Sequence, residues 1–469
     1  MRYQIEQSMK PNSNTNLTED LKMMNQSNTA PFLLQDETNR FLNSIVSGML
    51  IALLTVLMLS ISAHAQTPAP NQDRPIALEG ATIYTIADGV IENGTIVFEN
   101  GIITEIGEQV QIPDEAERVD VSGKEIYPGL IDGYSQMGIY EIGAVDMTLD
   151  INEQDRFNPN VRPEIAFNPE SRHIGTARTA GILTTVTTPS GGLVSGQSVA
   201  MMLDGWSWED MVLKSGVGLL VNWPSPGDEE DYEENLLELR DAFAGARSYH
   251  QAKRAMEAGE ASRKDVDSRL EAMIPVLEGD RPVVVEAHDL RQIQDAITWA
   301  EEEDVRLIIM GGRDAHYVAS HLVRKDIPVI VTTVLTSPNR EWEPYDYRYS
   351  LPARLHEAGV TFAIAGGASA PYTYRLPNEA GAAAAYGLDR IEALRSVTLS
   401  VAEILGIEDR VGSLQVGKDA TLLITTGNPL EYSTQIEQAY IEGRKIDMVD
   451  AHRMLYEKYR QKVDQRAGR

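Results

Sequence analysis

One pair of residues places a carboxylate and an imidazole at a spacing that suits proton transfer. Glu286 and His288 stand at the end of the apolar run 282–287. Side chains two positions apart on a strand point to the same side, so these groups are able to act as a weak acid–base pair. A structural histidine with satisfied hydrogen bonds is the alternative, and the sequence leaves both open. His288 is therefore the one histidine with a candidate pocket contact.

The other histidines provide no second catalytic cluster. The chain has eight histidines and no cysteine, which excludes thiolate metal ligands, cysteine nucleophiles and disulfides. His316 and His321 lie five positions apart, which is not the spacing of one helical face, so we expect both at the surface. The rest of those beyond the N-terminal segment have no partner near them in sequence: His173, His250, His356 and His452.

Composition indicates a globular protein that does not bind polyanions. The chain has 469 residues, of which 42% are hydrophobic and 24% charged. That length allows roughly one large domain with a smaller one, or two to three ordinary domains. The formal net charge of -29 repels phosphate backbones and anionic lipid heads. We therefore expect no nucleic-acid partner and no membrane contact of the mature chain.

The N-terminal segment has the features of an export signal. Residues 45–61 form an uncharged apolar run, and Ala63 and Ala65 supply the small-x-small pattern that a signal peptidase cuts after. We expect residues 1–65 to be removed and residues 66–75 to act as a linker, which implies a periplasmic or secreted protein. A long, nearly neutral stretch precedes the run, which leaves two alternatives: a true start downstream, near Met49, or an uncleaved anchor.

Two β-rich segments at opposite ends of the chain are expected to share one sheet. Residues 76–126 alternate and turn like antiparallel strands, and Asn100-Gly101 is a strong hairpin signal because both positions must accept a positive φ. Residues 420–424 predict a strand and residues 439–446 a hairpin. We assign residues 76–126 plus 406–448 to a composite β-sandwich domain.

Between these segments the chain alternates strands and helices. Short apolar runs rich in β-branched residues are typical of buried parallel strands, and they recur at 183–187, 218–222, 282–287, 305–310, 327–332 and 361–365. The helix from Asp289 carries its apolar residues on one face, and Asp289 and Gln292 suggest a capping pair. About seven such units over residues 127–405 favour an α/β (β/α)8 TIM-like barrel. A doubly wound open sheet is the alternative.

Three motifs carry a resemblance to the amidohydrolase superfamily. Residues 127–132 (YPGLID) resemble the family's first barrel strand, residues 414–420 (LQVGKDA) its exit from barrel to sheet, and residues 400–406 the helix before that exit. Residues 180–186 and 192–197 are similar to stretches of a secreted group related to imidazolonepropionase. The resemblance implies a (β/α)8 barrel with a β-sandwich from both chain ends. It also implies metal-dependent hydrolysis of C–N bonds.

The resemblance also implies where metal ligands should stand, and the residues there have the wrong chemistry. The family's His-x-His pair falls on Tyr134 and Gln136 of the first strand. Its fifth-strand histidine falls on Glu286, or on His288 if the match of the motif to this sequence is shifted. The sixth-strand histidine falls on Gly311, and the eighth-strand aspartate on Gly367. A phenol, an amide and two glycines do not replace imidazole and carboxylate ligands, so we expect a degenerate site with no metal and no cofactor.

Two functions follow from this pattern. The first is a non-catalytic or regulatory partner of an intact amidohydrolase, or of a second copy of this chain, with a small-molecule ligand at the barrel mouth. The second is a hydrolase of C–N bonds that uses non-standard ligands. The basic tail, residues 449–469, is expected to be helical, and Met454, Leu455 and Tyr459 form its apolar side. It docks either on a partner or on the acidic body of its own chain.

The export assignment predicts a mature chain that begins near Gln66, because cleavage after Ala65 fits the small-x-small pattern. N-terminal sequencing of protein collected from outside the cytoplasm measures this directly. Material that still carries residues upstream of Ile45 contradicts the prediction.

Overall fold

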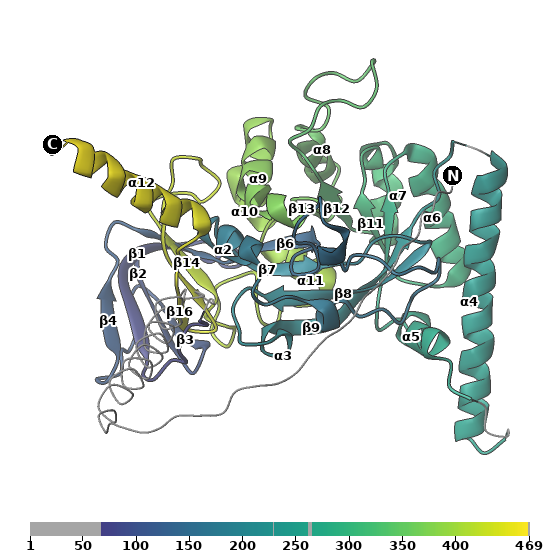
Figure 1. Ribbon diagram of the computed structural model, residues 1–469, viewed down its shortest axis with the longest axis horizontal. Coiled ribbons are helices and arrows are strands. Elements are labelled where there is room, and N and C mark those ends of the chain that lie inside the picture. Colours follow the sequence, from purple (N-terminus) through teal and green to yellow (C-terminus); the bar gives the residue numbers. More distant parts are fainter. Residues whose placement is uncertain (1–66, 228, 261–264, 468–469) are drawn as a thin grey trace, which may run out of the picture. The chain divides into compact units, whose positions relative to one another are not determined.

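The computed structural model describes residues 67–227, 229–260 and 265–467. Residues 66–469 form one compact unit, shown in Figure 1. The proposed export segment lies outside the described residues. Within the described ranges, none of the helices combines the length and the apolar character that a bilayer crossing requires.

The chain has a mixed α/β fold with two eight-stranded sheets. The composite sheet contains β1 (Ile76–Tyr84), β2 (Val90–Glu99), β3 (Ile102–Gly107), β4 (Glu117–Asp120), β5 (Glu125–Pro128), β14 (Leu422–Thr425), β15 (Ile436–Ile441) and β16 (Arg444–Ile446). The second sheet contains β6 (Leu130–Ser135), β7 (Ile182–Thr187), β8 (Val194–Met202), β9 (Val212–Asn222), β10 (Val283–Ala287), β11 (Leu307–Gly311), β12 (Val329–Thr332) and β13 (Phe362–Ala365).

Most helices follow strands of the second sheet. They are α2 (Arg172–Thr179), α3 (Trp208–Met211), α4 (Glu229–Glu257), α5 (Ser268–Leu277), α6 (Leu290–Glu303), α7 (Ala319–Lys325), α8 (Leu351–Glu357), α9 (Leu376–Ala385), α10 (Arg390–Arg395), α11 (Leu399–Leu405) and α12 (Ala451–Ala467). Short 3₁₀ helices are η1 (Asp146–Thr148), η2 (Pro163–Ala166), η3 (Ala315–Val318) and η4 (Ala370–Arg375).

Both chain ends contribute to the composite sheet, whose order is β16-β15-β14-β5-β1-β2-β3, with β4 also paired to β1. The junction between the ends is the antiparallel pair of β14 and β5, in which Leu422 faces Pro128. Asn100 and Gly101 turn the β2–β3 hairpin at φ 51° and 84°. The two ends thus share one hydrogen-bonded network, and strand pairing alone does not divide it into the two layers of a sandwich.

The second sheet is a nearly closed barrel, but it departs from the expected (β/α)8 pattern at β8. The order runs from β6 through β13 in sequence, and β8 is antiparallel to both β7 and β9. Only residues 188–193 connect β7 to β8, which is too short for the crossover that a parallel strand needs. The barrel therefore has seven parallel strands and one reversed strand, with no helix between β7 and β8.

The barrel closes through a loop segment between β13 and β6. The Ile131 N–H donates to the Val397 carbonyl at 2.8 Å, and the Ile364 N–H donates to the Ser396 carbonyl at 2.9 Å. Asp132 adds a direct link, since its Oδ1 accepts the Gly366 N–H at 3.0 Å. We call these contacts the seam.

Helix α6 matches its sequence pattern closely. Its buried residues include Ile293, Ala296, Ile297 and Ala300. The Gln292 side chain accepts the N–H groups of Asp289 and His288 at 3.0 and 3.1 Å. These bonds satisfy donors that the first turn of a helix leaves free, and they fix the chain directly after β10.

A buried carboxylate ties the barrel to the composite sheet. Asp204, which follows β8, accepts from Arg178 of α2 at 3.0 Å and from Arg444 of β16 at 2.7 Å. It also accepts the Ala69 N–H at 3.3 Å. The side chain of Asp204 is 2% exposed and those of Arg178 and Arg444 are 7% and 12% exposed. Burial is the largest influence on its pKa and raises it, against the lowering effect of both arginines.

We predict that Asp204→Asn lowers the free energy of unfolding by about 3–5 kcal/mol, because it removes the buried carboxylate that two buried guanidinium groups share. Chemical denaturation measures the change. The matched control is Arg118→Ala, which breaks the exposed pair with Glu79 and is expected to cost less than about 1 kcal/mol. Equal, small effects of both variants would show that Asp204 does not hold the sheets together.

Candidate functional site

The predicted ligand positions converge at the carboxyl end of the parallel strands, which is where barrels of this type carry out chemistry. β6 supplies Tyr134 and leads to Gln136, β10 supplies Glu286, β11 supplies Gly311, and Gly367 follows β13. These strands are the first, fifth, sixth and eighth along the sheet, as the family comparison expects. We call this region the barrel mouth.

Tyr134 faces Glu286 across the mouth. The Tyr134 side chain is buried, at 6% exposure. Burial raises the pKa of its phenol, and the nearby Glu286 carboxylate raises it further. The phenol is therefore held in its neutral form, whereas a metal ligand oxygen of this type is an anion.

Gln136 holds a loop rather than facing an open site. Its Nε2 donates to Ser190 Oγ at 3.1 Å, and its backbone N–H donates to the Ala368 carbonyl at 2.6 Å. Ser190 lies in the short β7–β8 connection. Asn222, at the end of β9, donates to the Gly192 carbonyl at 2.8 Å and to Ser195 Oγ at 2.8 Å in the same region. The side-chain amides of Gln136 and Asn222 thus hold the residues that lead into the reversed strand β8.

Glu286 and His288 do point to the same side, as their spacing predicts. His288 Nε2 lies 3.6 Å from Glu286 Oε1, and the two side chains are 36% and 35% exposed. This distance is beyond a good hydrogen bond, but both groups are open to solvent and to a ligand. The pair is the exposed acid–base combination at the mouth that the sequence indicates.

His288 also occupies the space that a side chain at position 311 would need. Gly311 has a φ of 95°, and a Cβ added there would lie 2.4 Å from His288 Cε1 and 2.5 Å from its Nδ1. Real Cβ atoms do not approach this closely, so a side chain at 311 requires the His288 ring, which is 36% exposed, to move aside. The positive φ of Gly311 adds backbone strain to any such side chain.

Gly367 is restricted by its backbone. Its φ is 93°, a conformation that L side chains rarely adopt, and an added Cβ would meet Thr333 Cγ2 at 3.0 Å. An aspartate at this position would therefore be strained. Neither glycine position accepts the expected ligand without a shift of the backbone.

Asp132 is the most deeply buried carboxylate beside the mouth. It is 0% exposed, and its Oδ1 accepts N–H groups from Gly366 at 3.0 Å and Tyr134 at 3.4 Å. Its Oδ2 is buried with no hydrogen-bond partner in the described part of the chain. Burial raises its pKa to about 7, against the lowering effect of the two N–H donors.

Sequence reasoning missed two groups near the mouth. Nothing singled out Asn222, because a lone asparagine at a strand end carries no pattern. His316 was expected at the surface, and this is wrong: it packs against Tyr347 and lies 3.3 Å from Arg354 Nη1. Burial, and then the charge of Arg354, lower its pKa to about 4. His316 therefore remains neutral in the structure at physiological pH.

The donor geometry for a metal is absent from the described ranges: no three histidine, aspartate or glutamate side chains there gather closely enough to hold an ion. At the mouth, Glu286 and His288 are the two groups with ligand chemistry. The other expected ligand positions offer less. Tyr134 has a neutral phenol, Gln136 has an amide that is already hydrogen-bonded, and Gly311 and Gly367 have no side chain.

Comparisons with known proteins agree with this architecture. The model of the Amidohydrolase family matches residues 351–449. The chain is 26% identical over 414 residues to an imidazolonepropionase from Geobacillus kaustophilus, covering 77% of this chain and 92% of that protein. It is 22% identical over 386 residues to the amidohydrolase tasK of Hapsidospora irregularis, covering 75% of this chain but only 39% of that protein.

A solved structure gives the same result. The crystal structure of an amidohydrolase from Thermotoga maritima MSB8 superposes with a TM-score of 0.73 at 27% identity, over 79% of this chain and 99% of that one. With the barrel-like sheet, the composite sheet and the ordered mouth positions, the chain belongs to the amidohydrolase superfamily. Hydrolysis of C–N bonds is the activity of that family.

We predict that the contribution of Asp132 to the stability of the protein falls as pH rises from about 4 to about 7. Its pKa is about 7 in the folded chain against an ordinary 3.8. The folded state therefore keeps a proton that the unfolded state has lost, which favours folding at low pH and costs up to a few kcal/mol at neutral pH. Asp132→Asn should flatten this slope, as measured by denaturant unfolding at several pH values.

The control for this measurement is Asp120→Asn. Asp120 is exposed, and hydrogen bonds from Ser122 lower its pKa, so its contribution has the opposite sign. Parallel curves for Asp132→Asn and the unmodified protein would show that the buried carboxyl does not titrate as described.

Proposed function

We propose that this protein is a non-catalytic member of the amidohydrolase superfamily that acts as a binding or regulatory partner. The observation that carries the proposal is the backbone at positions 311 and 367, where two of the family's ligands would stand. Both glycines have a positive φ, of 95° and 93°, which L side chains rarely adopt. The His288 ring also lies where a side chain at 311 would begin, so restoring these ligands requires backbone changes as well as substitutions.

The other former ligand positions support the same proposal. Gln136 is engaged with Ser190, and Tyr134 is buried and neutral. Structural zinc sites gain on the order of 10–16 kcal/mol from about four ligands. One carboxylate and one imidazole, 3.6 Å apart, do not approach that affinity, so the residues at the mouth do not fit the family's metal.

The mouth retains polar groups that suit ligand binding. Glu286 and His288 are each about one-third exposed, and Asn222 stands at the end of the neighbouring strand β9. A small molecule with hydrogen-bonding groups is the class of ligand that this lining fits. The proposed macromolecular partner is an intact homologous amidohydrolase or a second copy of this chain.

A second function is a hydrolase that works with Glu286 and His288 in place of the family's ligands. The observation in its favour is their shared orientation at the mouth. The carboxylate is able to orient the imidazole, and the imidazole is able to take a proton from water. This candidate predicts C–N bond hydrolysis that is lost in both Glu286→Gln and His288→Ala.

The metal content of the purified protein tests the non-catalytic proposal, and the loss of hydrolysis in Glu286→Gln and His288→Ala tests a hydrolase that works without a metal. We predict less than one equivalent of zinc, manganese or iron per chain in protein prepared without chelators, measured by mass spectrometry of the metals. His288→Ala serves as the matched variant. A stoichiometric metal in the unmodified protein that disappears in His288→Ala would refute the non-catalytic proposal and favour the hydrolase.

A further inference from the structure

The C-terminal helix α12 packs against very little of its own chain. It spans Ala451–Ala467, and every side chain from His452 to Arg466 is exposed. Its start is anchored, because the Thr179 hydroxyl donates to Asp450 Oδ2 at 2.6 Å and Arg453 Nη1 donates to the Met448 carbonyl at 2.7 Å. Helices of this length are marginal in water without tertiary packing.

One side of α12 is apolar. Leu455, Tyr459 and Val463 recur every four residues, which places them on one face, and Tyr456 adjoins them. These four side chains are between 49% and 64% exposed. Around them the helix is basic: five basic residues (Arg453, Lys458, Arg460, Lys462 and Arg466) stand against two acidic residues (Glu457 and Asp464). A partner surface should therefore be apolar with an acidic rim.

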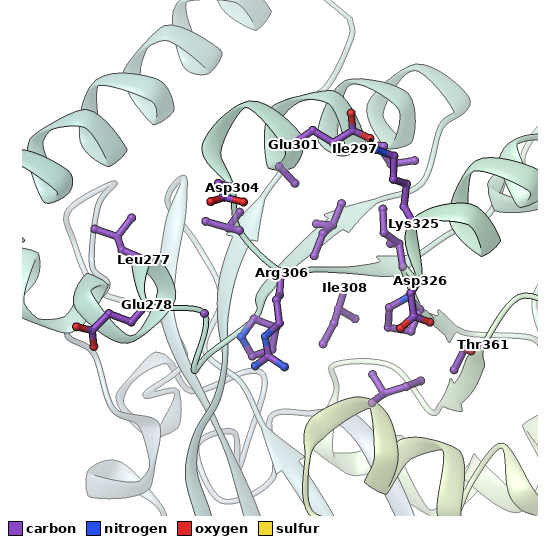
Figure 2. Close-up of a pocket in the computed structure, with 18 of the residues that line it drawn as sticks. Leu277, Glu278, Ile297, Glu301, Asp304, Arg306, Ile308, Lys325, Asp326 and Thr361 are labelled. Atoms are coloured by element: carbon purple, nitrogen blue, oxygen red, sulfur yellow. Dashed lines mark ion pairs between the residues drawn. The ribbon is translucent and has the colours of Figure 1, made fainter.

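The barrel carries such a surface at the end opposite the mouth. A groove of about 730 Å³ lies where β10, β11 and β12 begin, between α6, α7 and α11. Its apolar lining includes Leu277, Ile297, Ile308 and Ile404. Figure 2 shows Glu301, Asp304 and Asp326 around it. We call it the basal groove.

The charge balance of the basal groove is the reverse of that of α12. Its lining contains five acidic residues and two basic ones: Glu278, Glu301, Asp304, Asp326 and Glu403 against Arg306 and Lys325. Lys325 is already paired with Glu301 at 3.0 Å, and Glu403 is paired with Arg395 of α10 at 2.6 Å. The volume falls within the roughly 300–1,000 Å³ of ordinary ligand sites, so the groove can receive the side chains of an apolar helical face.

We propose that the apolar face of α12 docks in the basal groove of a second copy of this chain. The helix begins beside α2 and the composite sheet, whereas α6 and α7 stand on the other side of the barrel (Figure 1), so a chain does not fill its own groove. Helix-in-groove binding is a common mode of recognition. Two reciprocal contacts give a closed dimer, and unreciprocated contacts give a chain of copies.

This inference goes beyond the proposed function, because it holds whether or not the mouth is catalytic. An acidic body with a formal charge of -29 disfavours an anionic membrane as the occupant of α12. A second copy offers both the apolar floor and the opposite charge. Association should weaken as salt is raised, since the rim charges are exposed to solvent.

Charge exchange tests the proposal. Analytical ultracentrifugation of the full chain at low salt should show concentration-dependent association. Lys458→Glu with Lys462→Glu should weaken it about tenfold or more, and so should Glu301→Lys with Glu403→Lys in the groove. Mixing these two double variants should restore association. The acidic α12 of the first variant then meets the basic groove of the second, and the unmodified α12 of the second meets the unmodified groove of the first. Asp304 and Asp326 are left unchanged because their left-handed backbone, at φ 51° and 53°, suits aspartate.

The decisive measurement combines all four substitutions in one chain, which should associate far more tightly than either double variant. The control is Asp114→Lys with Glu115→Lys, an equal charge change at exposed residues away from the groove; it should leave association unaltered. Leu455→Ser with Val463→Ser tests the apolar face without a change of charge and should also weaken association. All these positions are exposed or on the groove's surface, and thermal unfolding verifies that each variant folds.

Three outcomes would overturn the inference. A chain that stays monomeric at every concentration has no such contact. Loss of association in the α12 variants but not in the groove variants places the helix on another surface, such as a second α12. Binding of α12 to vesicles of anionic lipid, weakened by Lys458→Glu with Lys462→Glu, assigns the helix to membranes instead.

Discussion

The barrel mouth depends on a buried carboxylate at the seam where the sheet fails to close by strand pairing. Asp132 links β6 to the turn after β13 through its Oδ1, which accepts the Gly366 N–H at 3.0 Å. The same oxygen accepts the Tyr134 N–H. One side chain therefore sets the positions of Tyr134 and of the glycines near Gly367 relative to each other. An apolar residue of similar size would leave both N–H groups without an acceptor.

Around this fixed seam, positions at which the resemblance expects metal ligands make structural contacts. Gln136 donates to Ser190 and so holds the β7–β8 connection, and the glycine at 311 gives His288 its place. Hydrogen bonds between the residues of the mouth therefore hold the strand ends together.

The sequence was sufficient where local chemistry and global fold agree. Asn100-Gly101 and the face of α6 follow from turn geometry and helical period, and the strand order followed from anchored motifs. Prediction from the sequence failed where tertiary contacts determine the direction of a strand or the burial of a side chain. β8 contains Ser195, Gly196 and Gln197, which interrupt the apolar pattern of a buried strand, and its direction depends on a short connection. His316 lies in a helical turn with no pattern, and only its neighbours Tyr347 and Arg354 bury it.

The reversed strand β8 has a consequence for how the chain folds. β7, β8 and β9 are consecutive antiparallel neighbours, so their pairing closes only short loops. Every other neighbouring pair of barrel strands is parallel and is joined by a longer crossover connection. At the seam, Asp132 and Gly366 are more than 230 positions apart. Local contacts form early because they cost little chain entropy. The meander of β7 to β9 is thus the part of the barrel whose pairing costs the least chain entropy, and the contact of Asp132 with Gly366 is among those that cost the most.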